Sequence, residues 1–242
     1  MDGVILAGGE GTRMRPLTLT TPKPLLKLQN RPILEWSLMS LRGIVKRVLI
    51  VVHYLKAQIA DFMARQTLFT DYALVEQSPR PLGTGHALLC CRERLQSDDF
   101  LVINGDDLFG RSALRALSEQ TYGILSARRL DYERYGVILK NAAGAFQAID
   151  EKPPRGRYPA PAPCSIGAYK FRADVFDYML AKTARGEYEI SDYMTAVARD
   201  HAVAVVDSPF WLSIGDPAAL AAAQNADISR WIPAPQSARQ SP

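Results

Sequence analysis

The chain has 242 residues, of which 48% are hydrophobic and 22% are charged, and this composition excludes disordered and fibrous classes. No apolar run approaches the roughly 20 residues that a membrane-spanning helix needs, so no membrane contact is expected. The net charge of +4 comes from Lys and Arg residues scattered along the chain, without a basic block that contains interleaved aromatics. Nucleic acid is therefore not expected as a partner, and binding of polyphosphate anions explains the positive excess equally well.

The N-terminus and the cysteines indicate the compartment. Asp2 stands where a secretory signal would carry positive charge, and Glu10 and Arg13 soon interrupt the apolar run. The three cysteines form an adjacent pair and a distant single residue, which is neither a metal-ligand spacing nor a disulfide framework. We therefore expect a cytoplasmic protein.

The first half of the chain alternates between short apolar runs and amphipathic segments. This pattern predicts strands at 4–7, 48–52, 73–76 and 100–104, and helices at 32–41, 56–65 and 84–95. The continuous apolar run at 48–52 is typical of a strand buried on both faces of a parallel sheet. The alternation predicts an α/β fold with a mostly parallel sheet and with functional residues at the carboxyl ends of its strands.

After residue 121 the pattern changes to shorter strands, which indicates a mixed or antiparallel extension. We expect strands at 123–127, 136–139, 145–149 and 165–171, and helices at 173–184, 192–199 and 216–231. Ser191 is the expected N-cap of the second of these helices. A proline-rich loop covers 153–163, and the tail at 233–242 lacks any apolar period and is expected to be flexible.

The richest segment is the loop that follows the first strand. Its glycines would let backbone N–H groups approach phosphate oxygens, and Arg13 and Lys23 supply positive charge. The spacing does not fit the dinucleotide fingerprint, because the third glycine is missing, and no Gly-Lys-Ser/Thr follows to complete a Walker motif. The loop reads Gly8-Gly9-Glu10-Gly11-Thr12-Arg13-Met14-Arg15-Pro16-Leu17-Thr18, followed by Pro22-Lys23-Pro24-Leu25.

This loop resembles the signature of the sugar-1-phosphate nucleotidylyltransferases, also called nucleoside-diphosphate-sugar pyrophosphorylases. The resemblance implies a Rossmann-like, mostly parallel mixed sheet flanked by helices, within one domain at 1–232 whose inserted sugar-binding part lies mainly at 121–212. It also implies assistance by Mg²⁺. By resemblance, Arg13 and Lys23 act at the reacting phosphates. The residues that the resemblance assigns to the nucleotide in this part of the chain are Leu6, Ala7, Gly8, Gly9, Gly11, Thr12 and Arg13.

A second motif combines Gln77 with the run Gly83-Thr84-Gly85-His86-Ala87. An amide side chain can pair with the edge of a base, and the glycines let a helix N-terminus approach the nucleotide. By resemblance to uridylyltransferases, Gln77, Gly83 and Thr84 bind the nucleotide. The gap between Gln77 and Gly83 is one residue longer than in that subgroup, with Arg80 as the extra residue. His86 is expected to pack or cap at the start of a helix.

A third motif, Asn104-Gly105-Asp106-Asp107, follows the strand at 100–104. A carboxylate that a glycine turn presents at the end of a strand is well placed to hold Mg²⁺ against phosphate oxygens. Asp106 matches the family's metal-binding aspartate and is expected to take part in catalysis. Asp107 is expected to point elsewhere.

The sugar side is assigned by resemblance alone. Gly136 would contact the sugar through its backbone, while the Glu151 carboxylate would accept hydroxyl protons and the Lys152 ammonium would meet the 1-phosphate. Ser165 stands where many relatives have Asn, and its shorter side chain changes the contact to the sugar's 2-position.

One departure from the family pattern concerns the metal. Ser213 holds the position at which many members carry a second metal ligand, and a neutral hydroxyl is a weak ligand for Mg²⁺. Asp216 could substitute, the hydroxyl could act through water, or the enzyme could be impaired. Asp216 is also the expected N-cap of the last helix, with Pro217 in its first turn.

These motifs imply attack by a sugar-1-phosphate oxygen on the α-phosphorus of a nucleoside triphosphate, with UTP favoured and dTTP second. The acceptor would be of the glucose-1-phosphate or N-acetylhexosamine-1-phosphate type. The alternatives are a cytidylyl- or guanylyltransferase that acts on another phosphate acceptor, or a catalytically silent regulatory subunit that binds nucleotide-sugars. Monomer and homo-oligomer both remain open.

Overall fold

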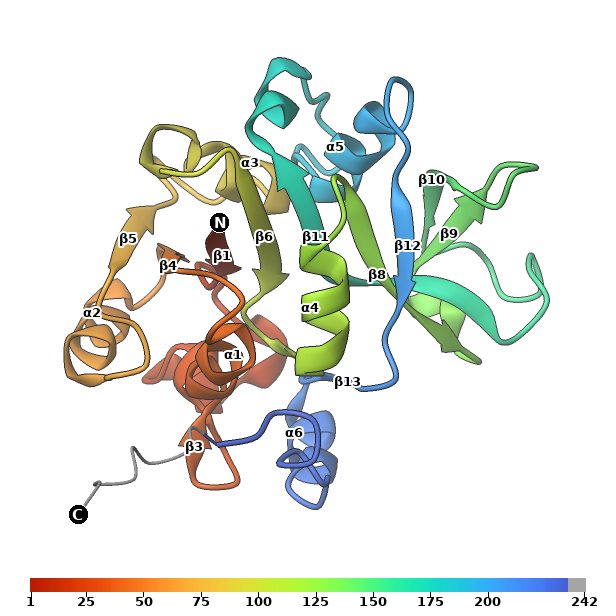
Figure 1. Cartoon of the computed structure of the whole chain (residues 1–242). Helices are drawn as coiled ribbons and strands as arrows, with labels where there is room; N and C mark the ends of the chain where they lie inside the picture. Colours follow the sequence, from red (N-terminus) through yellow and green to blue (C-terminus); the bar gives the residue numbers. More distant parts are fainter. Residues whose placement is uncertain (235–242) are drawn as a thin grey trace, which may run out of the picture.

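A computed structural model describes residues 1–234, and within them nine strands form one twisted sheet (Figure 1). The strand order is β10-β9-β11-β6-β1-β4-β5, and β8 pairs with both β11 and β12. The bounds of these strands are β1 Asp2–Leu6, β4 Arg47–Val52, β5 Tyr72–Glu76, β6 Asp99–Asn104, β8 Gly123–Arg129, β9 Gly136–Lys140, β10 Phe146–Glu151, β11 Ala162–Arg172 and β12 Ala204–Asp207.

The expected division into a parallel part and an antiparallel extension is confirmed. Strand β1 pairs in parallel with β4 and β6, and β4 pairs in parallel with β5. Strand β11 runs antiparallel to β6, β8 and β9. From β1 the chain adds β4 and β5 on one side of the sheet and then β6 on the other side. At such a reversal, the carboxyl ends of β1 and β6 open onto a crevice of the type that binds ligands in α/β sheets.

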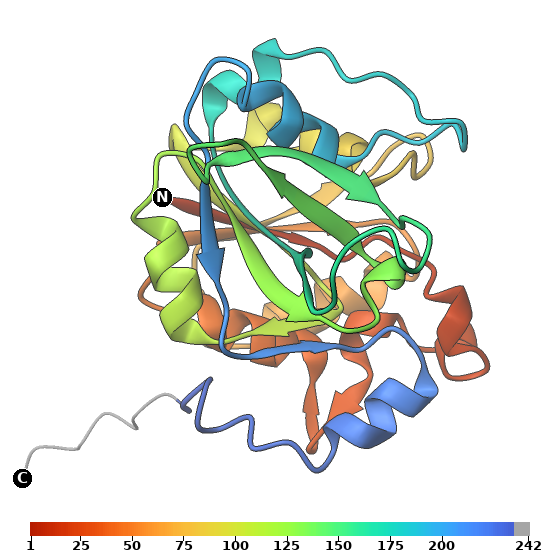
Figure 2. The same cartoon turned by 90° about the vertical axis from the view of Figure 1, so that its right-hand side faces the viewer.

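Helices cover both faces of the sheet, as Figure 2 shows. Adjacent residues of β1 point to opposite faces, so Val4 packs with α3 and α5 while Ile5 packs with α1, α2 and α4. This explains why the strand is apolar throughout. The helix bounds are α1 Ile33–Leu41, α2 Lys56–Arg65, α3 Thr84–Leu89, α4 Arg111–Ser118, α5 Ile190–Val197 and α6 Pro217–Ala223.

Two small ribbons lie outside the main sheet, and the first of them joins distant parts of the chain. Strand β7 (Asp107–Phe109) pairs with β13 (Trp211–Ser213), and β2 (Lys27–Leu28) pairs with β3 (Arg31–Pro32). A third apolar cluster packs the C-terminal segment against α1 and β7. Through these contacts the C-terminal segment reaches the same edge of the sheet as the loop after β1.

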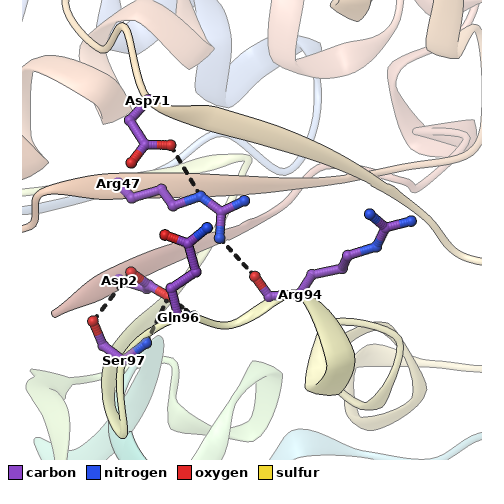
Figure 3. A network of polar contacts seen from close by, with 6 residues as sticks. All are labelled: Asp2, Arg47, Asp71, Arg94, Gln96 and Ser97. Carbon is purple, nitrogen blue, oxygen red and sulfur yellow. Dashed lines mark hydrogen bonds and ion pairs between the residues drawn. The ribbon is translucent and has the colours of Figure 1, made fainter.

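Polar contacts stabilise the sheet at the amino-terminal ends of its parallel strands (Figure 3). The carboxylate of Asp2, which is 2% exposed, accepts hydrogen bonds from the backbone N–H groups of Gln96 at 2.7 Å and Ser97 at 3.3 Å. Arg47 bridges the Asp71 carboxylate at 3.1 Å and a backbone carbonyl at 2.6 Å. These contacts lie at the opposite ends of the strands from the crevice, so they serve the fold.

Three expected helices are wrong in length. The expected helix at 84–95 ends as an α-helix at Leu89, and a separate 3-10 turn covers Arg92–Arg94. The expected helix at 216–231 ends at Ala223. At this end the Gln29 amide donates hydrogen bonds to backbone carbonyls, including that of Ala226 at 2.6 Å. At 173–184 only a 3-10 segment, Ala173–Asp177, forms.

The segment after Asp177 turns back instead of continuing as a helix. Gly186 adopts a φ of +78°, and Thr183 N–H donates to the Glu187 carbonyl at 2.8 Å. Tyr188 N–H then donates to the Leu82 carbonyl at 2.8 Å, which places this segment beside the loop before α3. Tertiary contacts of this kind outweigh the local helical pattern.

The expected N-cap role of Ser191 is also wrong, because Ser191 lies inside α5. The hydroxyl of Thr84 instead accepts a hydrogen bond from Ile190 N–H at 3.0 Å. A residue from a distant segment thus provides the acceptor for a backbone N–H in the first turn of α5. The tail expected at 233–242 lies largely outside the described residues. No helix between residues 1 and 234 combines the length and the apolar character that a membrane crossing requires.

Candidate active site

The crevice lies where β1 and β6 end next to each other. Leu6 is in register with Asn104, and Gly105 N–H donates to the Leu6 carbonyl at 3.0 Å. A Cβ on Gly105 would lie 2.7 Å from that carbonyl oxygen, so only glycine permits this close approach. The turn brings Asp106 beside the loop that follows β1.

That loop folds compactly around its lysine. Gly11 has a φ of +61°, and its carbonyl accepts a hydrogen bond from the Thr18 hydroxyl at 2.8 Å. A Cβ on Gly11 would lie 3.1 Å from the Lys23 Cβ, so the loop packs directly on the lysine stem. Lys23 is consequently buried and its ammonium is held at the floor of the crevice.

Lys23 and Asp106 form an ion pair with 2.5 Å between Nζ and Oδ2. The lysine side chain is 8% exposed and the aspartate side chain 35% exposed, so one partner is sequestered and the other faces the crevice. Charge-assisted hydrogen bonds of this type are stronger than neutral ones. The structure thus brings together the two residues that the sequence marks as acting at the reacting phosphates.

A first cavity of about 510 Å³ opens on one side of this pair. Every residue that the resemblance assigns to the nucleotide lines it, which brings segments from three parts of the chain to one place. These residues are Leu6, Ala7, Gly8, Gly9, Gly11, Thr12, Arg13, Gln77, Gly83 and Thr84. The volume is suited to a drug-sized or nucleotide-sized ligand.

Gln77 is buried at the edge of this cavity. Its Nε2 donates to the Gly83 carbonyl at 2.8 Å and lies 3.2 Å from His86 Nδ1, while Oε1 lies near Gly8. His86 packs inside α3, as expected, and partial burial lowers its pKa below the ordinary 6.5. Gly83 has a φ of +95°, and a Cβ there would lie 2.4 Å from the Tyr188 carbonyl.

A second cavity, of about 740 Å³, opens on the other side of the ion pair. The residues that the resemblance assigns to the sugar-phosphate and the metal line it, namely Gly136, Glu151, Lys152, Ser165, Asp106, Ser213 and Asp216. Arg13, Asn104, Asp106 and Gly215 line both cavities. The two spaces therefore share the wall that carries Asp106.

The sugar-side residues are placed by the pairing of β9 with β10. Gly136 is opposite Glu151, and a Cβ on Gly136 would lie 3.1 Å from Glu151 Oε1. Lys152 has a φ of +47°, and its N–H donates to the Tyr135 carbonyl at 3.0 Å. A non-glycine residue in this conformation is held against a local energetic cost, which is common at binding sites.

Asp107 does not point away from the site, so that expectation is wrong. It lines the second cavity and is 5% exposed, and its Oδ2 accepts a hydrogen bond from the Asn104 amide at 3.1 Å. Burial and the neighbouring Asp106 raise its pKa, while Asn104 and the Ser213 hydroxyl oppose that rise. Asp107 Oδ1 is buried without a hydrogen-bond partner among residues 1–234.

Asp216 caps α6, as its position before Pro217 predicts. Its Oδ1 accepts a hydrogen bond from Ala219 N–H at 2.9 Å, and Oδ2 lies 3.9 Å from an Arg134 guanidinium nitrogen. One carboxylate oxygen of Asp216 is therefore used to cap α6. Ser213, which ends β13, lies opposite Asp107.

Arg129, which lies on the aromatic side of the second cavity, was not predicted from the sequence. The Arg129 guanidinium lies 5.3 Å from the ring centroid of Tyr135 and 5.6 Å from that of Trp211. Arg129 also pairs with Asp131 at 2.7 Å. Tyr135 and Trp211 stand next to recognised motifs, but no local pattern marks Arg129, because it reaches the cavity from the end of β8.

The chain matches known proteins along nearly its whole length. The family model described as nucleotidyl transferase matches residues 2–230. The bifunctional protein GlmU of Methanococcus maripaludis is 30% identical over 236 residues, which cover 96% of this chain and 56% of that protein. A bifunctional sugar-1-phosphate nucleotidylyltransferase/acetyltransferase of Sulfurisphaera tokodaii is 26% identical over 96% of this chain and 55% of that protein. The chain thus spans about half the length of these curated relatives.

Solved structures confirm the fold. A UDP-glucose pyrophosphorylase complexed with UDP-glucose superposes with a TM-score of 0.82 at 21% identity, covering 95% of this chain and 98% of that chain. A UDP-glucose pyrophosphorylase from Acinetobacter baumannii gives a TM-score of 0.78 at 23% identity, covering 92% and 91%. The α/β architecture, the motifs gathered around Lys23 and Asp106, and the match over residues 2–230 together place this chain in the nucleotidyl transferase family.

Proposed function

We propose that this chain transfers a nucleotidyl group from a nucleoside triphosphate to a sugar-1-phosphate, which releases pyrophosphate and forms a nucleotide-sugar. The observation that carries the proposal is Asp106, which lines both cavities and is paired there with Lys23 of the first cavity. A triphosphate in one cavity and a sugar-phosphate in the other would meet there. The family match supports the same reaction class, and so does the similarity to the bifunctional sugar-1-phosphate nucleotidylyltransferase/acetyltransferase of Sulfurisphaera tokodaii.

In this reaction a phosphate oxygen of the acceptor attacks the α-phosphorus, and the bond from that phosphorus to the β-phosphate oxygen breaks. The attacking oxygen already carries negative charge near neutral pH, so no general base is required. The task of the chain is to hold two mutually repelling anions in line and to neutralise charge on the departing pyrophosphate. Arg13 and Lys23, which line the first cavity, would provide that neutralisation, and Lys152, which lines the second, would orient the acceptor phosphate.

The donor chemistry on the shared wall fits a hard divalent cation such as Mg²⁺, which prefers carboxylate and carbonyl oxygens. Asp106 is partly exposed there, and Asp107 contributes a buried oxygen that has no partner among residues 1–234. Asp106 would hold the cation. Bound Mg²⁺ would neutralise phosphate charge, in addition to the neutralisation that Arg13 and Lys23 provide.

We propose UTP as the preferred donor and dTTP as the second. With Nε2 of Gln77 committed to Gly83, its Oε1 is the atom left to accept a hydrogen bond. The imide N–H of uracil or thymine can donate to that oxygen, and a purine would need more space beside the Gly83 turn. A mismatched base leaves polar groups unpaired, and this can give large specificity ratios.

The test is a pyrophosphate-release screen that crosses UTP, dTTP, CTP, GTP and ATP with glucose-1-phosphate and N-acetylhexosamine-1-phosphates. We expect release that depends on the acceptor, with the highest kcat/KM for UTP. If GTP or ATP is preferred, the interpretation of the Gln77 loop is wrong while nucleotidyl transfer survives. Nucleotide-sugar binding without any pyrophosphate release would instead favour a silent regulatory subunit.

A further inference from the structure

The inference concerns Asp107, and it rests on the cation of the proposed function. We propose that the Asp107 carboxylate is a second oxygen ligand of the divalent cation that Asp106 holds. The cation site is then built from two consecutive residues, Asp106 in the turn after β6 and Asp107 at the start of β7, while Ser213 supplies only a neutral hydroxyl beside it.

The first ground is the unpaired oxygen of Asp107. Oδ2 is hydrogen-bonded to the Asn104 amide at 3.1 Å and the Ser213 hydroxyl also stabilises the carboxylate, but Oδ1 is buried and makes no hydrogen bond of normal geometry in the described part of the chain. Leaving a carboxylate oxygen buried and unpaired is unfavourable, and native proteins seldom contain such a group without an ion, a water or a functional reason. A cation that binds Oδ1 would remove the penalty.

The second ground is the position of Asp107 in the same cavity as Asp106. Asp106 and Asp107 both line the second cavity, and Asp106 also lines the first. The backbone of Asp107 is fixed by the pairing of β7 with β13, and its Oδ2 lies close to Gly167, where an added Cβ would be 3.2 Å away. The absence of a side chain at Gly167 leaves room for the carboxylate and for Asn104, whose Nδ2 would lie 2.0 Å from such a Cβ.

The third ground is the chemistry of Mg²⁺, which keeps several waters and commonly takes one or two protein carboxylates together with substrate phosphates. Between residues 1 and 234, no group of three His, Cys, Asp or Glu side chains could hold a metal. A site of two carboxylates therefore takes its remaining ligands from water and from substrate phosphates. Asp216 is the remaining acidic candidate at this end of the cavity, and one of its oxygens already caps α6.

The experiment measures Mn²⁺ binding to the full chain by electron paramagnetic resonance, without triphosphate or sugar-phosphate. Wild type should bind Mn²⁺, and Asp107→Asn should weaken that binding at least about tenfold. Transferring the carboxylate to the opposite strand, in Asp107→Asn/Ser213→Asp, should restore most of the affinity. Asp216→Asn is the matched control, because Asn caps a helix as well as Asp does, and its Mn²⁺ affinity should match wild type.

Thermal melting checks that each variant folds, and Asp107→Ser replaces Asp107→Asn if the latter does not fold. The inference is overturned if Asp107→Asn binds Mn²⁺ as wild type does, or if wild type binds none. An Asp107→Asn variant with unchanged Mn²⁺ binding and a raised KM for sugar-1-phosphate would make Asp107 a sugar contact instead. Because Mn²⁺ binding is measured without substrates, its outcome is separate from that of the pyrophosphate-release screen.

Discussion

Replacing Gly83 by alanine tests how the nucleotide loop is built. The new Cβ would lie 2.4 Å from the Tyr188 carbonyl oxygen and 3.0 Å from its amide nitrogen, and both are backbone atoms that cannot rotate away. With φ +95° and ψ 176°, Gly83 lies in a region that is essentially restricted to glycine, which adds a conformational penalty of about 1–3 kcal/mol, and overpacking adds about 1–3 kcal/mol. We therefore expect Gly83→Ala to lower Tm by roughly 5–15 °C for a domain of this size.

Gly144→Ala is the matched control, because Gly144 has a φ of +79° but no heavy atom within 4 Å of the added Cβ. This variant should show the penalty of a positive φ alone, about 1–2 kcal/mol, which corresponds to a fall in Tm of roughly 2–8 °C. Gly83→Ala should also raise KM for the triphosphate, since Gly83 lines the first cavity, whereas Gly144→Ala should leave KM unchanged. Equal effects of the two variants on Tm and on KM would refute the steric argument.

Three further predictions concern the shared wall and α3. Asp106→Asn should fold normally yet retain less than about a tenth of wild-type turnover, measured as pyrophosphate release, and higher activity would contradict the assignment. Arg13→Ala and Lys23→Ala should each lower kcat more than they raise KM for sugar-1-phosphate, and an effect on KM alone would reduce either residue to ground-state binding. The lowered pKa of His86 means that the unfolded chain binds its proton more readily, so stability should fall as pH drops below about 6.5. In His86→Gln the dependence of Tm on pH between about 5 and 6.5 should be shallower, and an unchanged slope would exclude this histidine as its source.

The parallel part of the sheet could be predicted because β1, β4 and β6 are apolar on both faces and are bounded by turn residues. The three-residue strands β7 and β13 could not be predicted, because they are too short to show a period and exist through their pairing with each other. Helix α4 has an apolar face at Ala113, Leu114 and Leu117 and carries Arg and Ser on its other face, so its amphipathic pattern is visible in the sequence although it was not predicted.

The residues of the candidate site also fall into those that a local sequence pattern marks and those that only tertiary contacts bring to the site. Residues that belong to local motifs, such as Gly11, Lys23 and Asp106, could be named from the sequence, since glycine turns and charged loops leave a local pattern. Asp107 was misjudged because its orientation depends on a partner strand far along the chain. Arg129 was missed because its place between Tyr135 and Trp211 is a tertiary contact.

The central claim is that a sugar-1-phosphate oxygen displaces pyrophosphate directly from the α-phosphorus. The most direct test uses sugar-1-phosphate labelled with ¹⁸O at the non-bridging phosphate oxygens, with UTP as donor and mass spectrometry of both products. The account predicts a nucleotide-sugar that retains all of the label and a pyrophosphate that contains none. Label in the pyrophosphate, or pyrophosphate release that does not depend on the sugar-phosphate, would contradict it.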